Sequence, residues 1–360
     1  MGEKRIEWVD IYKGIAICLM VIGHVTGMFN QYIYQFHMAA FFLISGYTLK
    51  WEKRGIIKMI SKKTYSLLIP YFSAFIYFLI LDNILILTNT RQMFYDDRMM
   101  YISGLESIKQ LIFHGNNYMW LLGAGWFVIV LFVIEIVHSV IAEVCKYQLT
   151  IYSIAGAVLY LAGYLLVKRG VIVQIAMFPI DLAFIGGGFY AVGVVFRRKN
   201  ILTNVTKSKK NFLITFVASI VILYYLGNIE ICTVNYPTRT FNSLFNELVA
   251  GVNGSIFLFC CSILIGKKDK IKSIFVYLGR NTLGIVFFHF QFFKLAFWMM
   301  YLCGIVEYEY MRNFLPTDEI GAKYWWLIAF VSVVASVLEW KILTSIKYIR
   351  VLFGKKEFPV

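Results

Sequence analysis

Long apolar segments recur along the whole chain, separated by short clusters of charged and polar residues. Most are long enough for an α-helix to cross a hydrocarbon core about 30 Å thick, which takes roughly 17 to 25 residues. Because lipid offers the backbone no hydrogen bonds, such segments are expected to be helices, whereas a β-barrel would show shorter alternating segments. The pattern predicts about ten transmembrane helices, at 11–29, 33–50, 65–88, 125–145, 151–167, 172–196, 211–227, 247–266, 282–303 and 324–344.

The loops between these segments predict a topology. Lys and Arg gather in both terminal regions and in alternate loops, around Lys53, Lys146, Arg197 and Lys267. Cytoplasmic loops of membrane proteins carry such an excess of basic residues. We therefore expect both termini in the cytoplasm and a multi-pass protein of the cell (cytoplasmic) membrane. Residues 89–124 form the longest outer segment, which is typical of a lid or a re-entrant piece.

Composition agrees with a membrane protein and excludes a water-soluble one. The chain is 60% hydrophobic and 15% charged, with a mean hydropathy of +0.70. The net charge of +15 then reflects topology, so no nucleic-acid partner is expected. The six cysteines show neither metal-ligand spacing nor a disulfide framework, so no metal site is expected either. Residues 1–360 are predicted to be one all-α transmembrane domain.

Ionisable residues inside membrane spans are costly and are candidates for function. Asp10, Lys13 and His24 lie on the first predicted helix, and the step from Lys13 to His24 is three turns plus roughly 20°. Asp10 falls within roughly 40° of His24 by the same count, so a polar stripe runs from the cytoplasmic edge into the membrane. A short turn near Asn30 to Tyr32 separates the first two predicted helices. His24 lies about as far before this turn as His37 lies after it, so the two histidines are predicted to lie at a similar depth in the membrane.

These residue types suit proton transfer. A neutral imidazole exchanges a proton near physiological pH, so His24 could deprotonate a hydroxyl group during group transfer to an alcohol. The ordinary alternative for a single membrane histidine is a hydrogen bond to a neighbouring helix. Asp10, near the membrane edge, is equally compatible with a helix N-cap.

The same residues carry a family resemblance. The run Arg5–Gly14, the pair Gly23–His24, the pair Phe36–His37 and the run Phe41–Tyr47 resemble the membrane-bound acyltransferase-3 family. Lys13 stands where that family often has Arg, which keeps the charge but loses bidentate geometry. Weaker matches follow at Pro70–Tyr71, Trp126–Phe127, Gly279–Leu283 and His289. Many relatives carry two arginines spaced by two residues in the loop that corresponds to Lys62–Tyr65. This chain lacks that pair, which leaves open how the loop would contact the acyl donor.

The resemblance implies an enzyme that moves an acyl group, usually acetyl, from acetyl-CoA to a hydroxyl of a cell-surface polysaccharide or a lipid-linked sugar. Acyl-CoA would be a donor substrate, with no permanently bound cofactor. The partners implied are the lipid bilayer, the carbohydrate acceptor and separate glycan-assembly proteins.

Our hypothesis for the mechanism assigns roles along the polar stripe. CoA phosphates bind the cytoplasmic basic surface, with Lys13 and Arg5 at the entrance, and the acyl arm follows the stripe. His24 acts as the general base or as a transient acyl carrier, with Asp10 or His37 orienting its partners.

Four further residues are candidates for substrate contacts. Ser45 precedes a glycine, and this pair is also compatible with close helix packing. Trp126 is equally compatible with an anchor at the membrane interface. Asn281 and His289 either line the cytoplasmic half of the cavity or form hydrogen bonds between helices. By contrast, we interpret Glu135 and His138, three residues apart on the fourth predicted helix, as a structural pair.

A transporter or flippase of a glycan or lipid-linked precursor is the alternative function, because intramembrane charges would also serve a substrate pathway. Transporters tend to have paired broken helices in two repeated halves. Here Pro179 and the neighbouring Gly186–Gly188 have no counterpart elsewhere in the sequence. The residues therefore favour an O-acyltransferase.

Overall fold

The computed structural model describes residues 5–25, 27–51, 55–93, 95, 104–114, 119–229 and 234–354. The chain is 80% helical, which confirms the all-α prediction. Within the described ranges, nine helices are long and apolar enough to cross a membrane. They are α1 (Glu7–Val25), the continuous α4–η2–α5 (Ile56–Leu87), η4–α7 (Trp120–Val144), α8 (Leu149–Lys168), α9 (Ile180–Arg198), α11 (Lys209–Asn228), α12 (Leu244–Ile265), α14 (Thr282–Leu302) and α15 (Glu319–Ser345).

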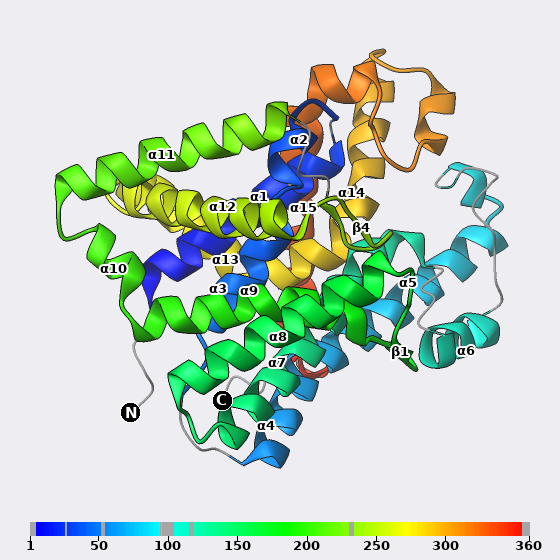
Figure 1. Ribbon diagram of the computed structural model, residues 1–360. Coiled ribbons are helices and arrows are strands. Elements are labelled where there is room, and N and C mark those ends of the chain that lie inside the picture. The colour runs from blue at the N-terminus through cyan, green and yellow to red at the C-terminus, as the bar shows by residue number, and fades with distance from the viewer. Residues whose placement is uncertain are drawn as a thin grey trace.

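These helices pack into one bundle. α8 lies along α9, α11 along α12, α14 along α15, and α1 crosses several of them near the centre of the molecule (Figure 1). The first long helix after α3 is composite. It consists of α4 (Ile56–Lys63), a π-helical turn η2 (Thr64–Leu68) and α5 (Ile69–Leu87). The segment η4 (Trp120–Gly125) leads into α7 (Trp126–Val144) in the same way.

The remaining elements are short and lie between or beside the long helices. The helical ones are η1 (Gly27–Phe29), α2 (Asn30–Ile33), α3 (His37–Tyr47), η3 (Arg91–Met93), α6 (Gly104–His114), α10 (Ile201–Val205), α13 (Asp269–Arg280), η5 (Tyr308–Arg312) and α16 (Ile349–Leu352). Two antiparallel hairpins pair β1 (Gln174–Ile175) with β2 (Phe178–Pro179), and β3 (Val234–Asn235) with β4 (Thr240–Phe241).

Two predicted spans differ from the helices observed. The segment 33–50 forms α3, whose eleven residues cover about 16 Å, roughly half of a hydrocarbon core. Nearly every α3 residue is buried against protein, so its apolar length reflects a central helix packed on all sides. The first part of the predicted span 172–196 is the β1–β2 hairpin, and α9 begins only at Ile180, directly after Pro179.

The predicted outer segment 89–124 contains η3, α6 and the start of η4. Residues 94, 96–103 and 115–118 of that prediction lie outside the part of the chain that the structure describes.

Glycines let α3 approach α9 closely. A Cβ atom on Gly46 would collide with the carbonyl of Tyr190, and one on Gly193 would collide with the carbonyl of Leu43. Such small residues allow helix backbones to touch in membrane proteins. The contact holds α3 at the centre of the bundle, where its two ends reach the two cavities described below.

Candidate functional site

A cavity of about 250 Å³ lies among α1, α3, the start of α7 and the β3–β4 hairpin. His24 enters it from the last turn of α1 and His37 from the first residue of α3. The two histidines therefore share one cavity. Trp126, at the start of α7, also lines this cavity.

Tyr34 lies between the two histidines. Its Oη is 3.3 Å from His24 Nδ1 and 3.3 Å from the Gly23 carbonyl oxygen. We assign the phenolic proton to the Gly23 carbonyl, which can only accept, so that the phenolic oxygen accepts the His24 Nδ1–H. In this assignment the neutral His24 ring carries its lone pair on Nε2, the atom that a general base needs.

His37 has a similar local arrangement. Its Nδ1 donates to the Ile33 carbonyl at 3.1 Å, and its ring lies edge-on to Tyr34 with centroids 5.0 Å apart. Because Nδ1 is held by the backbone, Nε2 of the neutral ring is again the basic atom. Within the described structure His37 forms no hydrogen bond to His24, but the rings of both histidines contact the Tyr34 ring.

His289, on α14, stacks on His24 with ring centroids 5.4 Å apart and an interplanar angle of 26°. Its Nδ1 donates to the Ile285 carbonyl at 2.8 Å, within its own helix. The side chain is fully buried, and its Nε2 has no partner within the described structure. His289 thus lies at the level of His24, rather than in the cytoplasmic half of the cavity as one of our alternatives placed it.

A second cavity, of about 510 Å³, lies at the opposite ends of α3 and α7, next to α4. Lys50, Lys58, Lys62 and Lys63 line it, together with Ser45 from the end of α3. The four lysines outnumber the two carboxylates of the lining, Glu135 and Glu143, so the cavity carries a net positive charge that favours anions.

Glu135 forms the inner wall of this second cavity. Its two carboxylate oxygens accept from Lys63 Nζ at 2.7 Å and from the Tyr190 hydroxyl at 2.9 Å. His138 instead contacts the Tyr152 hydroxyl through Nδ1 at 2.8 Å. Our interpretation of Glu135 and His138 as a pair is therefore wrong, because each is hydrogen-bonded to a residue of another helix; the Tyr190 ring, 5.0 Å from the His138 ring between centroids, lies next to both.

Asp10 is part of an ion cluster at the start of α1. Its carboxylate contacts Arg280 Nε at 3.0 Å and Arg5 Nε at 3.5 Å, and it is almost completely buried. Since α1 begins at Glu7, Asp10 lies inside the helix and the N-cap alternative is wrong. Lys13 lies one turn further on, within electrostatic range of the carboxylates of Asp10 and Glu135.

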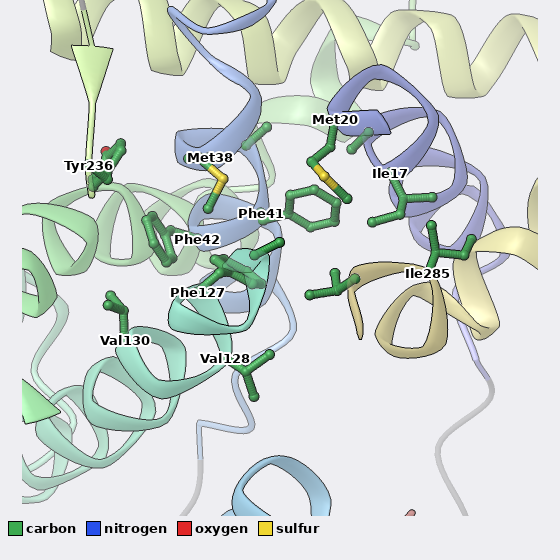
Figure 2. Close-up of a cluster of buried hydrophobic side chains, with 14 of the residues drawn as sticks. Ile17, Met20, Met38, Phe41, Phe42, Phe127, Val128, Val130, Tyr236 and Ile285 are labelled. Atoms are coloured by element: carbon green, nitrogen blue, oxygen red, sulfur yellow. The ribbon is translucent and has the colours of Figure 1, made fainter. Parts of the chain in front are cut away.

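The two cavities are separate. They share no lining residue, and within the described chain Lys13 lines neither of them. Phe41 and Phe127 line the histidine cavity, and both Phe41 and Phe42 pack on Phe127, with ring centroids 5.5 and 5.3 Å apart (Figure 2). His37 and Ser45, which reach the two cavities from α3, are eight residues or about 12 Å apart along that helix. Lys13 and His24, which lie on the predicted polar stripe of α1, therefore share no cavity.

Five predicted site residues line neither cavity within the described chain: Arg5, Asp10, Lys13, Asn281 and His289. Other residues that do line the cavities carried no recognisable signal in the sequence. Asn281 donates to the Tyr277 carbonyl at 2.8 Å, at the junction of α13 and α14. Sequence reasoning missed Tyr34 and the whole β3–β4 hairpin, where Tyr236 stacks on Trp126 with centroids 6.0 Å apart. Only the position of Tyr34 three residues before His37 in the sequence could have suggested that it belongs to the site.

The fold and its cavities define a class: a multi-pass helical membrane protein with an imidazole-lined pocket among its helices. No group of three or more potential metal ligands occurs among the described residues. The chain belongs to the acyltransferase-3 family, because the family model described as an acyltransferase domain matches residues 6–341, nearly the whole chain. The protein is therefore a membrane acyltransferase. No curated protein and no solved structure matches it.

Proposed function

We propose that the protein transfers an acyl group, typically acetyl, from acyl-CoA to a hydroxyl of a cell-surface polysaccharide or lipid-linked sugar, with His24 as the general base. The observation that carries this proposal is the position of His24. It lines a cavity large enough for part of a sugar, and Tyr34 holds its Nδ1 so that Nε2 is the basic atom.

The basic cavity is the proposed entrance for the donor. Lys58 and Lys62 would bind the phosphates of CoA there, and Lys13 and Arg5 would add to the attraction from the neighbouring ion cluster. Lys13 is eleven residues from His24, about 16 Å along α1, so it acts on the donor rather than at the reacting hydroxyl.

The acyl arm would then pass between the two cavities. Phe41 and Phe127 lie in its path, and rotation of these side chains would let a thioester reach His24. These aromatic side chains would therefore act as a gate that opens when the acyl arm enters.

The chemical step balances without a further reactant. His24 Nε2 takes the proton of the acceptor hydroxyl, whose oxygen attacks the thioester carbonyl. The carbon–sulfur bond breaks, an ester forms, and the CoA thiolate recovers a proton from the imidazolium. His37 and Tyr34 orient the base and the acceptor hydroxyl, whereas Asp10 holds the donor end through Arg280.

Replacement of His24 by Gln tests the proposal. Loss of a general base is expected to lower acyl transfer by about 10²- to 10⁴-fold. Purified protein in lipid nanodiscs would be supplied with radiolabelled acetyl-CoA and methyl glycosides, and the labelled ester would be counted. The matched control is His138→Gln, which removes a buried histidine outside both cavities and should keep activity within about fivefold. Transfer by His24→Gln at a rate within tenfold of the unsubstituted protein would exclude His24 as the base.

A further inference from the structure

The β3–β4 hairpin places one stretch of backbone along the histidine cavity. Five consecutive residues, 234–238, line it, at the side facing His24 and His37. The hairpin is short, with Val234 opposite Phe241 and Asn235 opposite Thr240. Its turn is therefore the part of the hairpin nearest to any ligand in the cavity.

Two buried carboxylates hold this turn from two different helices. The Tyr236 hydroxyl donates to Glu247 of α12 at 3.1 Å, and the Arg239 guanidinium forms a two-point ion pair with Asp181 of α9. Glu247 and Asp181 are 1% and 0% exposed. Buried carboxyl groups are costly unless they are paired or hydrogen-bonded. Loss of the Arg239 contact would leave the Asp181 charge uncompensated, and loss of the Tyr236 hydroxyl would leave Glu247 with the Tyr160 hydroxyl as its hydrogen-bond donor.

The backbone of the turn is strained where the ion pair forms. Arg239 has a φ of 57°, in the left-handed region that non-glycine residues rarely occupy. Glycine would fit this conformation more easily but has no guanidinium for Asp181. The chain thus keeps a strained arginine that fixes the turn, and such strain clusters at ligand-binding positions.

Polar groups of the turn remain available at the cavity. Asn235 and Thr238 are both exposed and line it. The Thr238 Oγ1 lies 3.0 Å from the Thr240 Oγ1, and a hydroxyl in one such hydrogen bond keeps a lone pair that can accept another. The Asn235 Oδ1 accepts from the Thr238 backbone N–H at 3.2 Å, which leaves the two Nδ2 protons without a partner within the described chain. Behind them Tyr236 stacks on Trp126, whose ring is partly exposed in the same cavity.

We propose that the β3–β4 turn recognises the acceptor, with Asn235 and Thr238 binding hydroxyl groups of a sugar ring whose apolar face lies on Trp126. This inference rests on the proposed function, and it names the specificity-determining part of the same site. An amide donor, a hydroxyl and an aromatic plane are the combination that a hydroxylated ring requires, since one face of such a ring is apolar and its edge is polar.

The variant Asn235→Asp tests the turn with little change in shape. The carboxylate still accepts from the Thr238 N–H, but the Nδ2 donor is lost. The KM for the acceptor should rise about three- to tenfold, as expected for one lost hydrogen bond, with acetyl-CoA hydrolysis in the absence of acceptor unchanged. Thr238→Val should raise the same KM and change the order of preference among acceptors. The control Asn204→Asp alters an exposed asparagine of α10 and should change neither quantity.

The assay would use purified full-length protein in nanodiscs, labelled acetyl-CoA, and the methyl glycosides of glucose, galactose and N-acetylglucosamine as probes. The inference is overturned if both turn variants keep the acceptor KM and the order of preference within twofold, or if no glycoside is acetylated while acetyl-CoA is hydrolysed. Failure of the unsubstituted protein to hydrolyse acetyl-CoA or acetylate any acceptor would instead overturn the proposed function. Thermal unfolding of each variant separates a lost contact from a lost fold.

Discussion

Tyr34 shows how much of the site depends on one hydroxyl group. It contacts both histidines of the cavity through its ring, and its Oη is within 3.3 Å of His24 Nδ1. Without that oxygen the imidazole could rotate or adopt the other neutral tautomer, and the lone pair would leave Nε2. Tyr34 is therefore a positioning residue for the proposed base rather than a group that reacts.

The variant Tyr34→Phe should lower kcat by about tenfold or more, because the basic nitrogen is no longer held toward the acceptor. The KM for acetyl-CoA should not change, since the donor enters through the other cavity. Steady-state kinetics with labelled acetyl-CoA measures both constants. Tyr32→Phe is the matched control: this nearby hydroxyl accepts from Asn228 outside the histidine cavity. An equal loss of kcat in both variants would contradict a specific role for Tyr34.

At the scale of elements, the short central helix α3 determines how the two cavities are arranged. Its first residue, His37, reaches the histidine cavity, and Ser45 near its end reaches the basic one. Its position depends on the glycine contacts with α9, where Gly46 meets Tyr190 and Gly193 meets Leu43, backbone to backbone. A backbone carbonyl cannot move aside as a side chain can, so these contacts tolerate no added carbon.

The variant Gly46→Ala should therefore destabilise the protein by about 2 kcal/mol or more, because α3 and α9 must separate to admit the methyl group. Thermal unfolding in a mild detergent, followed by helical circular dichroism, would show a lower midpoint. Gly27→Ala serves as the comparison, because a Cβ atom there meets nothing within 4 Å. Unfolding midpoints that agree for the two variants would show that the α3–α9 approach is not the constraint we describe.

At the scale of the whole molecule, the two cavities differ in the chemistry of their linings. Lysines gather around the cavity of about 510 Å³, whereas aromatic and imidazole groups line the cavity of about 250 Å³. The Phe41–Phe127 contact belongs to the wall of the smaller cavity. This arrangement supports the proposal that an anionic donor and a sugar acceptor bind in different places and meet at His24.

Reversal of one charge in the basic cavity tests the proposed donor site. Lys58→Glu should raise the KM for acetyl-CoA by about tenfold at low ionic strength, and added salt should reduce the difference. The KM for S-acetyl-N-acetylcysteamine, which carries the thioester without phosphates, should stay the same. Lys210→Glu, at an exposed lysine of α11 outside the cavity, is the control. A similar KM increase for both thioesters would mean that Lys58 does not bind phosphate.

Sequence reasoning identified the membrane-spanning helices and the first-helix histidine, because each depends on local information. Nine spans followed from apolar length, and the placement of His24 and His37 in one cavity followed from helical geometry on either side of a short turn. The family resemblance, confirmed by the match over residues 6–341, also came from short motifs.

Only the tertiary structure decided which side chains meet. Apolar length cannot distinguish α3, buried by protein on every side, from a full span facing lipid. Nor can spacing along one helix show that Glu135 finds Lys63 and Tyr190 while His138 finds Tyr152. The β3–β4 turn joins Asp181, Tyr236 and Glu247 from separate parts of the chain. Such contacts arise from packing between distant segments, whereas hydropathy and helical period are properties of neighbouring residues.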